Sequence, residues 1–166
     1  MSFLKAFGFG FLVLIISNLL LVIILYASFG QFSTIPAIFT SPTSLTYNLF
    51  CSMGHAIWIL IDRMAYHITN DNLFFALLPL ANIIAPLIAA IIAGRFGKKR
   101  IISFGAVGLM AIISVIVSLI LMFNSVSYEI IIGGVLLGSG ALFNVFLGGI
   151  LNILIYGAIA FFTTKR

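Results

Sequence analysis

The side chains best suited to chemistry in this 166-residue chain lie between residues 42 and 70. They are His55, Asp62, Tyr66 and His67. Imidazole and carboxylate groups are common ligands of metal ions and common groups in acid–base catalysis. However, Asp62 follows His55 by seven positions, about 10.5 Å along a helix, which is too far for one metal ion with ligands at about 2 Å. We therefore predict that the protein is not an enzyme and that it holds neither a metal nor a cofactor.

A second set of polar side chains is neutral and lies within strongly apolar stretches. Asn144, Asn152 and Tyr156 recur at multiples of four residues, which places them along one face of a helix. Asn82 lies in another apolar stretch, between two prolines. In a membrane helix such side chains either form hydrogen bonds to neighbouring helices, at about 0.6 kcal/mol each, or line a pathway for a small solute. Both interpretations stay open from the sequence.

The basic residues are concentrated in one short stretch, "RFGKKR", which holds four of the eight Lys and Arg residues. These four are Arg95, Lys98, Lys99 and Arg100. We expect this turn to fix the orientation of the chain and to contact anionic lipid headgroups, at about 1 kcal/mol per charge. Although the net charge is +5, the charges flank apolar stretches, so we expect no nucleic-acid partner.

The stretch "GRFGKKR" resembles the basic loop between the second and third helices of major facilitator transporters. In that family an acidic residue precedes Arg-x-Gly and a basic run. Here Gly94 stands in the place of the acid, so the charge that locks the family's gate is missing. The chain is also far too short for a twelve-helix carrier. We treat the likeness as convergent and assign the chain to no family.

The elements that position these residues follow from an apolar composition, with 63% hydrophobic and 7% charged residues. Soluble domains carry roughly a quarter charged residues. A membrane-crossing helix needs about 20 apolar residues, and four stretches are long enough: 7–29, 73–93, 101–123 and 130–162. The sequence therefore predicts an all-α integral membrane protein, one domain over 1–166, built as a four-helix transmembrane bundle.

The distribution of basic residues predicts the orientation of this bundle. An even number of crossings places both termini on one side of the membrane. If that side is the cytoplasm, seven of the eight Lys and Arg residues lie inside and Arg63 lies outside, as the positive-inside rule requires. We therefore expect a protein of the cell (plasma) membrane with both termini in the cytoplasm.

The last apolar stretch, 130–162, is longer than a single crossing requires. As one helix its roughly 33 residues would measure near 50 Å, against a hydrocarbon core of about 30 Å. One helix bent at Gly148–Gly149 is the simplest interpretation. Gly134 and Gly138 form a GxxxG motif, which lets another helix pack closely in this chain or in a second one.

The connection 30–72 differs in character from the four apolar stretches. Its first part, up to Ser41, is rich in turn-forming residues, and we expect an exposed loop there. From Pro42 onwards a 3.6-residue pattern predicts one amphipathic helix of about seven turns. A crossing here would reverse the charge asymmetry, so we place this helix on the outer face. Its polar face would offer these residues for contact with a partner: His55, Asp62, Arg63 and Tyr66.

These features lead to two hypotheses about function. The first is a small, non-catalytic structural or accessory subunit of a membrane assembly or homo-oligomer, with membrane lipids and other membrane subunits or copies of itself as partners. The alternative is a channel or transporter-like protein that passes a small solute along a pathway lined by neutral polar residues. The two differ in whether Asn82 and the Asn144–Tyr156 stripe line a pathway or pack within the bundle.

Overall fold

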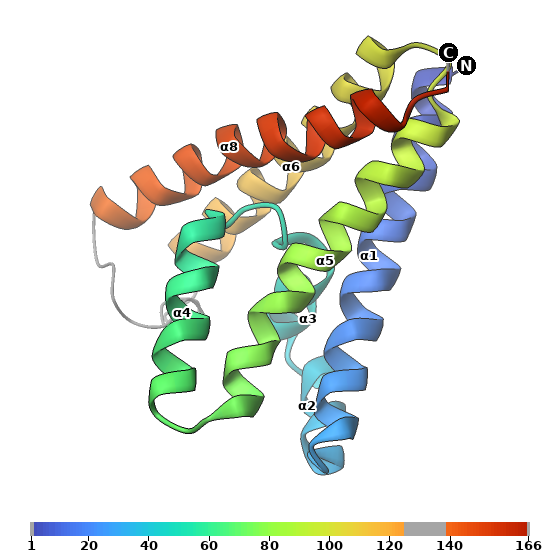
Figure 1. Ribbon diagram of the computed structural model, residues 1–166. Helices are drawn as coiled ribbons and strands as arrows, with labels where there is room; N and C mark the ends of the chain where they lie inside the picture. Colours follow the sequence, from blue (N-terminus) through green and yellow to red (C-terminus); the bar gives the residue numbers. More distant parts are fainter. Residues whose placement is uncertain (1, 125–138, 166) are drawn as a thin grey trace.

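The computed structural model describes residues 2–124 and 139–165, which form helices joined by short connections without any strand in these ranges (Figure 1). The helices are α1 (Ser2–Ser28), η1 (Phe32–Thr34), α2 (Ile35–Thr40), α3 (Pro42–Phe50), α4 (Ile57–Thr69), α5 (Leu73–Phe96), α6 (Arg100–Asn124) and α8 (Ser139–Thr163). Within the described ranges, α1, α5, α6 and the part of α8 from Leu142 onwards are long and apolar enough to cross a membrane. The predicted all-α class with four membrane-crossing helices is confirmed at this level.

The last helix is described over only part of its predicted length. Helix α8 continues without interruption through Gly148–Gly149 to Thr163. Residues 130–138 of the predicted 130–162 stretch lie outside the described residues. The same is true of Gly134 and Gly138, so their packing motif stays a prediction.

The four long helices pack as two pairs, α1 with α5 and α6 with α8 (Figure 1). The pairs meet near the chain termini and diverge towards the other end of the molecule. Helices α3 and α4 fill the space between the diverging pairs, where α3 packs on α1 and α6 and α4 packs on α5.

Both termini lie at the end where the two helix pairs meet (Figure 1). The turn between α5 and α6, which carries the RFGKKR stretch, lies at this end as well. The bundle therefore has most of its basic residues at one end, together with both termini. Which side of a membrane this end faces stays a prediction.

The segment that follows α1 contains more helix than the sequence predicts. The prediction of a loop before Ser41 is wrong, because η1 and α2 occupy most of it, whereas most of these residues are exposed as predicted. A proline lies in the first turn of α2, where its fixed φ favours a helix and its missing N–H leaves no bond unmade. Ile38 of α2 is buried against α1 and α5.

The prediction of one continuous amphipathic helix is also wrong. Its start is as expected, since Ser41 caps α3 by accepting a hydrogen bond from the Ser44 amide at 3.3 Å. However, α3 ends at Phe50 and α4 begins at Ile57. The six residues between them, Cys51–Ala56, are non-helical and fully buried. Their contacts with other helices, described below, override the local helical pattern.

We call Pro42–Thr69 the re-entrant hairpin and Cys51–Ala56 its tip. Met53 of the tip belongs to the same buried cluster as Leu14 of α1 and Met110 of α6, and both lie near the middle of their helices. The hairpin therefore enters between the helix pairs and turns back about half-way along them. At membrane depth, non-helical backbone is tolerated only where protein or a water-filled cavity surrounds it, which is consistent with the complete burial of the tip.

Candidate functional site

The hairpin tip is held in place by a side chain of α8. The Asn152 amide nitrogen donates hydrogen bonds to the carbonyl oxygens of Met53 and His55, each at 2.8 Å. Asn152 is itself buried. It therefore satisfies two carbonyl groups that the break in the helix leaves without helical partners.

Two glycines allow the backbone of the tip to approach α6 and α8 closely. A Cβ atom at Gly54 would lie 2.1 Å from the Ser118 hydroxyl oxygen of α6. A Cβ atom at Gly148 of α8 would lie 2.5 Å from the backbone nitrogen of Ala56. Because real Cβ atoms do not approach so closely, both positions require glycine for this packing.

Further hydrogen bonds join the hairpin and α8 to the first helix pair. The Asn18 side chain of α1 donates to the carbonyl oxygen of Asn48 in α3. The Tyr156 hydroxyl of α8 donates to the carbonyl oxygen of Ile83 in α5 at 3.2 Å. Asn152 and Tyr156 of the predicted stripe therefore take part in packing between segments.

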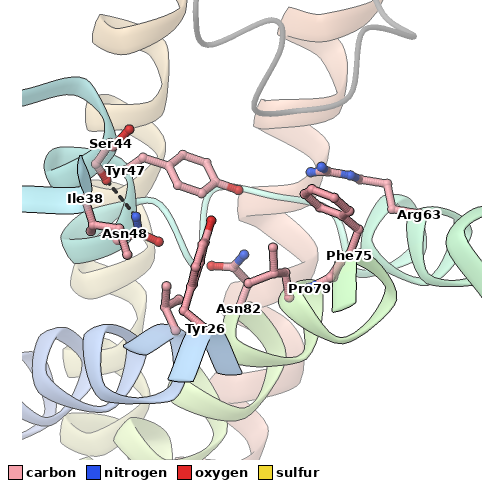
Figure 2. A pocket seen from close by; sticks show the side chains of 11 residues that line it. Tyr26, Ile38, Ser44, Tyr47, Asn48, Arg63, Phe75, Pro79 and Asn82 are labelled. Carbon is pink, nitrogen blue, oxygen red and sulfur yellow. Dashed lines mark hydrogen bonds between the residues drawn. The ribbon is translucent and has the colours of Figure 1, made fainter. Parts of the chain in front are cut away.

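A cavity of about 250 Å³ lies between α1, α5 and the hairpin (Figure 2). Its lining residues come from five helices: Val22, Tyr26, Ile38, Ser44, Tyr47, Asn48, Arg63, Phe75, Leu78, Pro79 and Asn82. Asn82 is thus a member of the predicted pathway set that does line a cavity. Asn144 is a half-buried residue of α8 and is not among the lining residues of this cavity.

Polar groups from four helices converge in this cavity. The hydroxyl groups of Tyr26 and Tyr47, the Asn82 carboxamide and the Arg63 guanidinium point into the same space (Figure 2). The Tyr47 hydroxyl interacts with the side chains of both Arg63 and Asn82. These groups offer several hydrogen-bond donors in one place.

Arg63 brings a positive charge to this cavity. Among the cavity-lining residues that the structure describes, none carries a carboxylate. Arg63 lies six residues after Ile57, the first residue of α4, and therefore about 9 Å along the helix from the tip. Charged side chains at such depth are costly in a membrane protein and are kept chiefly for function.

No family model, curated protein or solved structure matches this chain. The cavity and the hairpin must therefore be interpreted from their own geometry.

The residues predicted to form one polar contact face occupy three different environments. His55 lies in the tip with 4% of its surface exposed, so its prediction as an outer contact is wrong. Arg63 lines the cavity, whereas Asp62 and Tyr66 are exposed. The break at the tip removes His55 from the helix that carries the other three residues. In the described ranges, no three His, Cys, Asp or Glu residues lie close enough together to hold a metal ion.

The basic residues at the opposite end are largely open to the surroundings. Arg95, Lys98 and Lys99 are exposed. Arg100 is half-buried, and its guanidinium lies 5.1 Å from the centre of the Phe161 ring, a cation–π arrangement. Their predicted contact with lipid headgroups stays a prediction.

Sequence reasoning missed the two tyrosines of the cavity and the tip itself. One signal was present in Gly54, which interrupts the apolar and polar pattern of residues 42–70. Glycine inside a helix costs about 1 kcal/mol relative to alanine and often marks a break or a close backbone contact. Tyr26 carries no comparable signal, because tyrosine near the end of a membrane helix is common, and nothing in the sequence around Tyr47 links it to Tyr26 or Arg63.

Proposed function

We propose that this chain is a channel or transporter-like membrane protein whose cavity receives a small polar solute. The observation that supports this proposal most directly is the re-entrant hairpin, which stops at the middle of the bundle and forms one wall of a polar cavity. In membrane transporters, interrupted helices that meet near the midplane commonly form solute sites.

The position of the cavity fits entry from the end opposite the termini. Tyr26 lies near the last turn of α1, and Phe75 lies in the first turn of α5. Both helix ends are at the end where the helix pairs diverge. In the other direction the buried cluster around Met53 closes the bundle. Passage across the membrane would therefore require the tip to move relative to α6 and α8.

The contacts of the tip suit such a movement. At Gly54 and Gly148 the backbone of the tip approaches α6 and α8 without a glycine side chain between them. The Asn152 side chain of α8 donates two hydrogen bonds to the tip. A short non-helical segment can move without disrupting the long helices.

An accessory role in a membrane assembly is a second candidate. It is favoured by the outer side of α4, where Ile61, Tyr66 and Ile68 have 54%, 64% and 57% of their surfaces exposed. Ile61 and Ile68 would offer an apolar contact there for a neighbouring subunit. Co-purification of a stoichiometric partner in mild detergent supports this candidate, and a monomer that is active alone contradicts it.

Solute flux in proteoliposomes tests the transport proposal. The purified protein is reconstituted, and vesicle re-swelling after osmotic shock is measured with urea, glycerol and sodium butyrate. We expect at least one solute to enter faster than into protein-free vesicles. Ser44→Phe fills the cavity and should abolish this flux, whereas Ser28→Phe adds the same ring at an exposed position of α1 and should not. Flux equal to that of empty vesicles for all three solutes, or unchanged by Ser44→Phe, would contradict the proposal.

A further inference from the structure

We infer that the cavity binds a small monocarboxylate, with its carboxylate on Arg63 and its short hydrocarbon chain against the apolar wall. This inference rests on the proposed function, because it names the chemical class of the solute that the cavity receives.

The charge in the cavity favours an anion. Arg63 contributes a guanidinium that stays protonated at any physiological pH. An anionic ligand in the cavity would pair with this charge. A guanidinium presents parallel N–H groups that match the two oxygens of a carboxylate.

The neutral polar groups complete the recognition of an oxyanion. The hydroxyl of Tyr47, a residue with 7% of its surface exposed, lies beside both Arg63 and Asn82. The Tyr26 hydroxyl points towards the same space (Figure 2). Hydroxyl and amide N–H groups donate to the lone pairs that a bidentate arginine leaves unused. These donors come from α1, α3 and α5, so they require the folded bundle.

Most of the remaining wall is apolar, and Ser44 and Asn48 of α3 complete it. Val22 and Ile38 are each 5% exposed and lie on the side formed by α1 and α2, with Leu78 and Pro79 of α5 also in the lining. The volume of about 250 Å³ is below the roughly 300–1,000 Å³ of pockets for drug-sized ligands. A chain of a few carbons with one charged end fits these properties, whereas a nucleotide is too large for this volume.

Equilibrium binding to the full-length protein in detergent tests this inference by titration calorimetry. The probes are sodium acetate, sodium butyrate, butyramide and inorganic phosphate. We expect butyrate to bind at least tenfold more tightly than butyramide, its neutral counterpart. Each buried methylene adds about fourfold in affinity, so butyrate should also bind more tightly than acetate. Equal binding of butyramide, or tighter binding of phosphate than of butyrate, would overturn the inference.

Substitutions at and beside Arg63 assign the carboxylate contact. Arg63→Met should weaken butyrate binding at least tenfold, and Arg63→Lys should weaken it less because the charge is kept. Asp62→Asn changes the charge next to Arg63 but on the exposed side of α4, and it should leave the affinity within twofold. If Arg63→Met does not fold, Tyr47→Phe provides the second test, with an expected loss of about threefold to tenfold. Unchanged affinity in the variants that fold would refute the assignment.

The two proposals fail in different experiments. Binding in detergent requires no passage across a membrane, so butyrate binding without flux contradicts the transport proposal and leaves the binding site standing. Flux of urea or glycerol that Ser44→Phe abolishes, without butyrate binding, contradicts the carboxylate site alone.

Discussion

Gly148 of α8 lies directly against Ala56, the last residue of the hairpin tip, so that a Cβ atom at Gly148 would meet the Ala56 nitrogen at 2.5 Å. The nearest atoms are backbone, which cannot rotate away as a flexible side chain can. This contact shows that α8 and the tip are packed at the closest distance that two backbones allow. Stability and accessibility of the tip should therefore depend on small side chains at a few positions.

Adding one methyl group at Gly148 should loosen the tip. We expect Gly148→Ala to lower the free energy of unfolding by about 1–3 kcal/mol, the usual cost of overpacking. Cys51 is the single cysteine of the chain and is fully buried in the tip, so its reaction with a thiol-reactive fluorophore during heating measures this loss. Gly8→Ala is the matched control, because nothing lies within 4 Å of a Cβ atom there. A midpoint for Gly148→Ala equal to that of Gly8→Ala would show that the contact does not exist.

The contact between Gly54 and Ser118 should be revealed by a compensating substitution. Gly54→Ala places a methyl group on the Ser118 hydroxyl, and we expect a lower midpoint of Cys51 labelling. Adding Ser118→Gly removes the obstructing side chain and should restore part of this loss, since residues in contact show non-additive effects. Strictly additive effects of the two substitutions would mean that Gly54 and Ser118 are not neighbours.

Removing the Asn152 amide should leave two buried carbonyl groups unsatisfied. Asn152→Leu keeps a similar volume but cannot donate to the carbonyls of Met53 and His55. Since an unsatisfied buried polar group costs about 1–3 kcal/mol, we expect faster labelling of Cys51 under native conditions. Asn124→Leu serves as the control, because Asn124 is exposed at the end of α6 and bonds only within its own helix. Equal labelling rates in the two variants would exclude this role of Asn152.

The orientation of the bundle can be measured by cysteine labelling in intact cells. In a Cys51→Ala background, Lys98→Cys lies in the turn between α5 and α6, and Gln31→Cys lies just after α1 at the other end. Both positions are exposed. We expect a membrane-impermeant maleimide to label Gln31→Cys in intact cells and Lys98→Cys only after permeabilisation. The reverse pattern would invert the predicted topology and place the cavity on the cytoplasmic side.

The long helices could be predicted from the sequence because their formation depends on local properties. In 73–93, for example, an uninterrupted apolar stretch is sufficient to predict a membrane-crossing helix, and α5 extends only slightly beyond it. The start of α3 was also predictable, since Ser41 followed by Pro42 is a local capping signal. Each of these predictions uses residues that are near each other in the chain.

The candidate site could not be predicted in the same way. The cavity joins Tyr26, Tyr47, Arg63 and Asn82 from four helices, and no spacing in the sequence brings them together. The break at the tip depends on Asn152, which bonds to carbonyl groups almost a hundred positions earlier in the chain. Local periodicity predicted an unbroken helix here because the pattern on either side of the break keeps the same helical period.

The sequence by itself determined that this protein is built from four long apolar helices with most of its basic residues at one end, because hydropathy and charge act over short segments. Only the tertiary structure decided that the segment between the first two of these helices folds back into the bundle and that Arg63 faces a cavity. The physical reason is that a buried helix break is stable only when distant side chains satisfy its carbonyl groups and distant glycines leave room for its backbone.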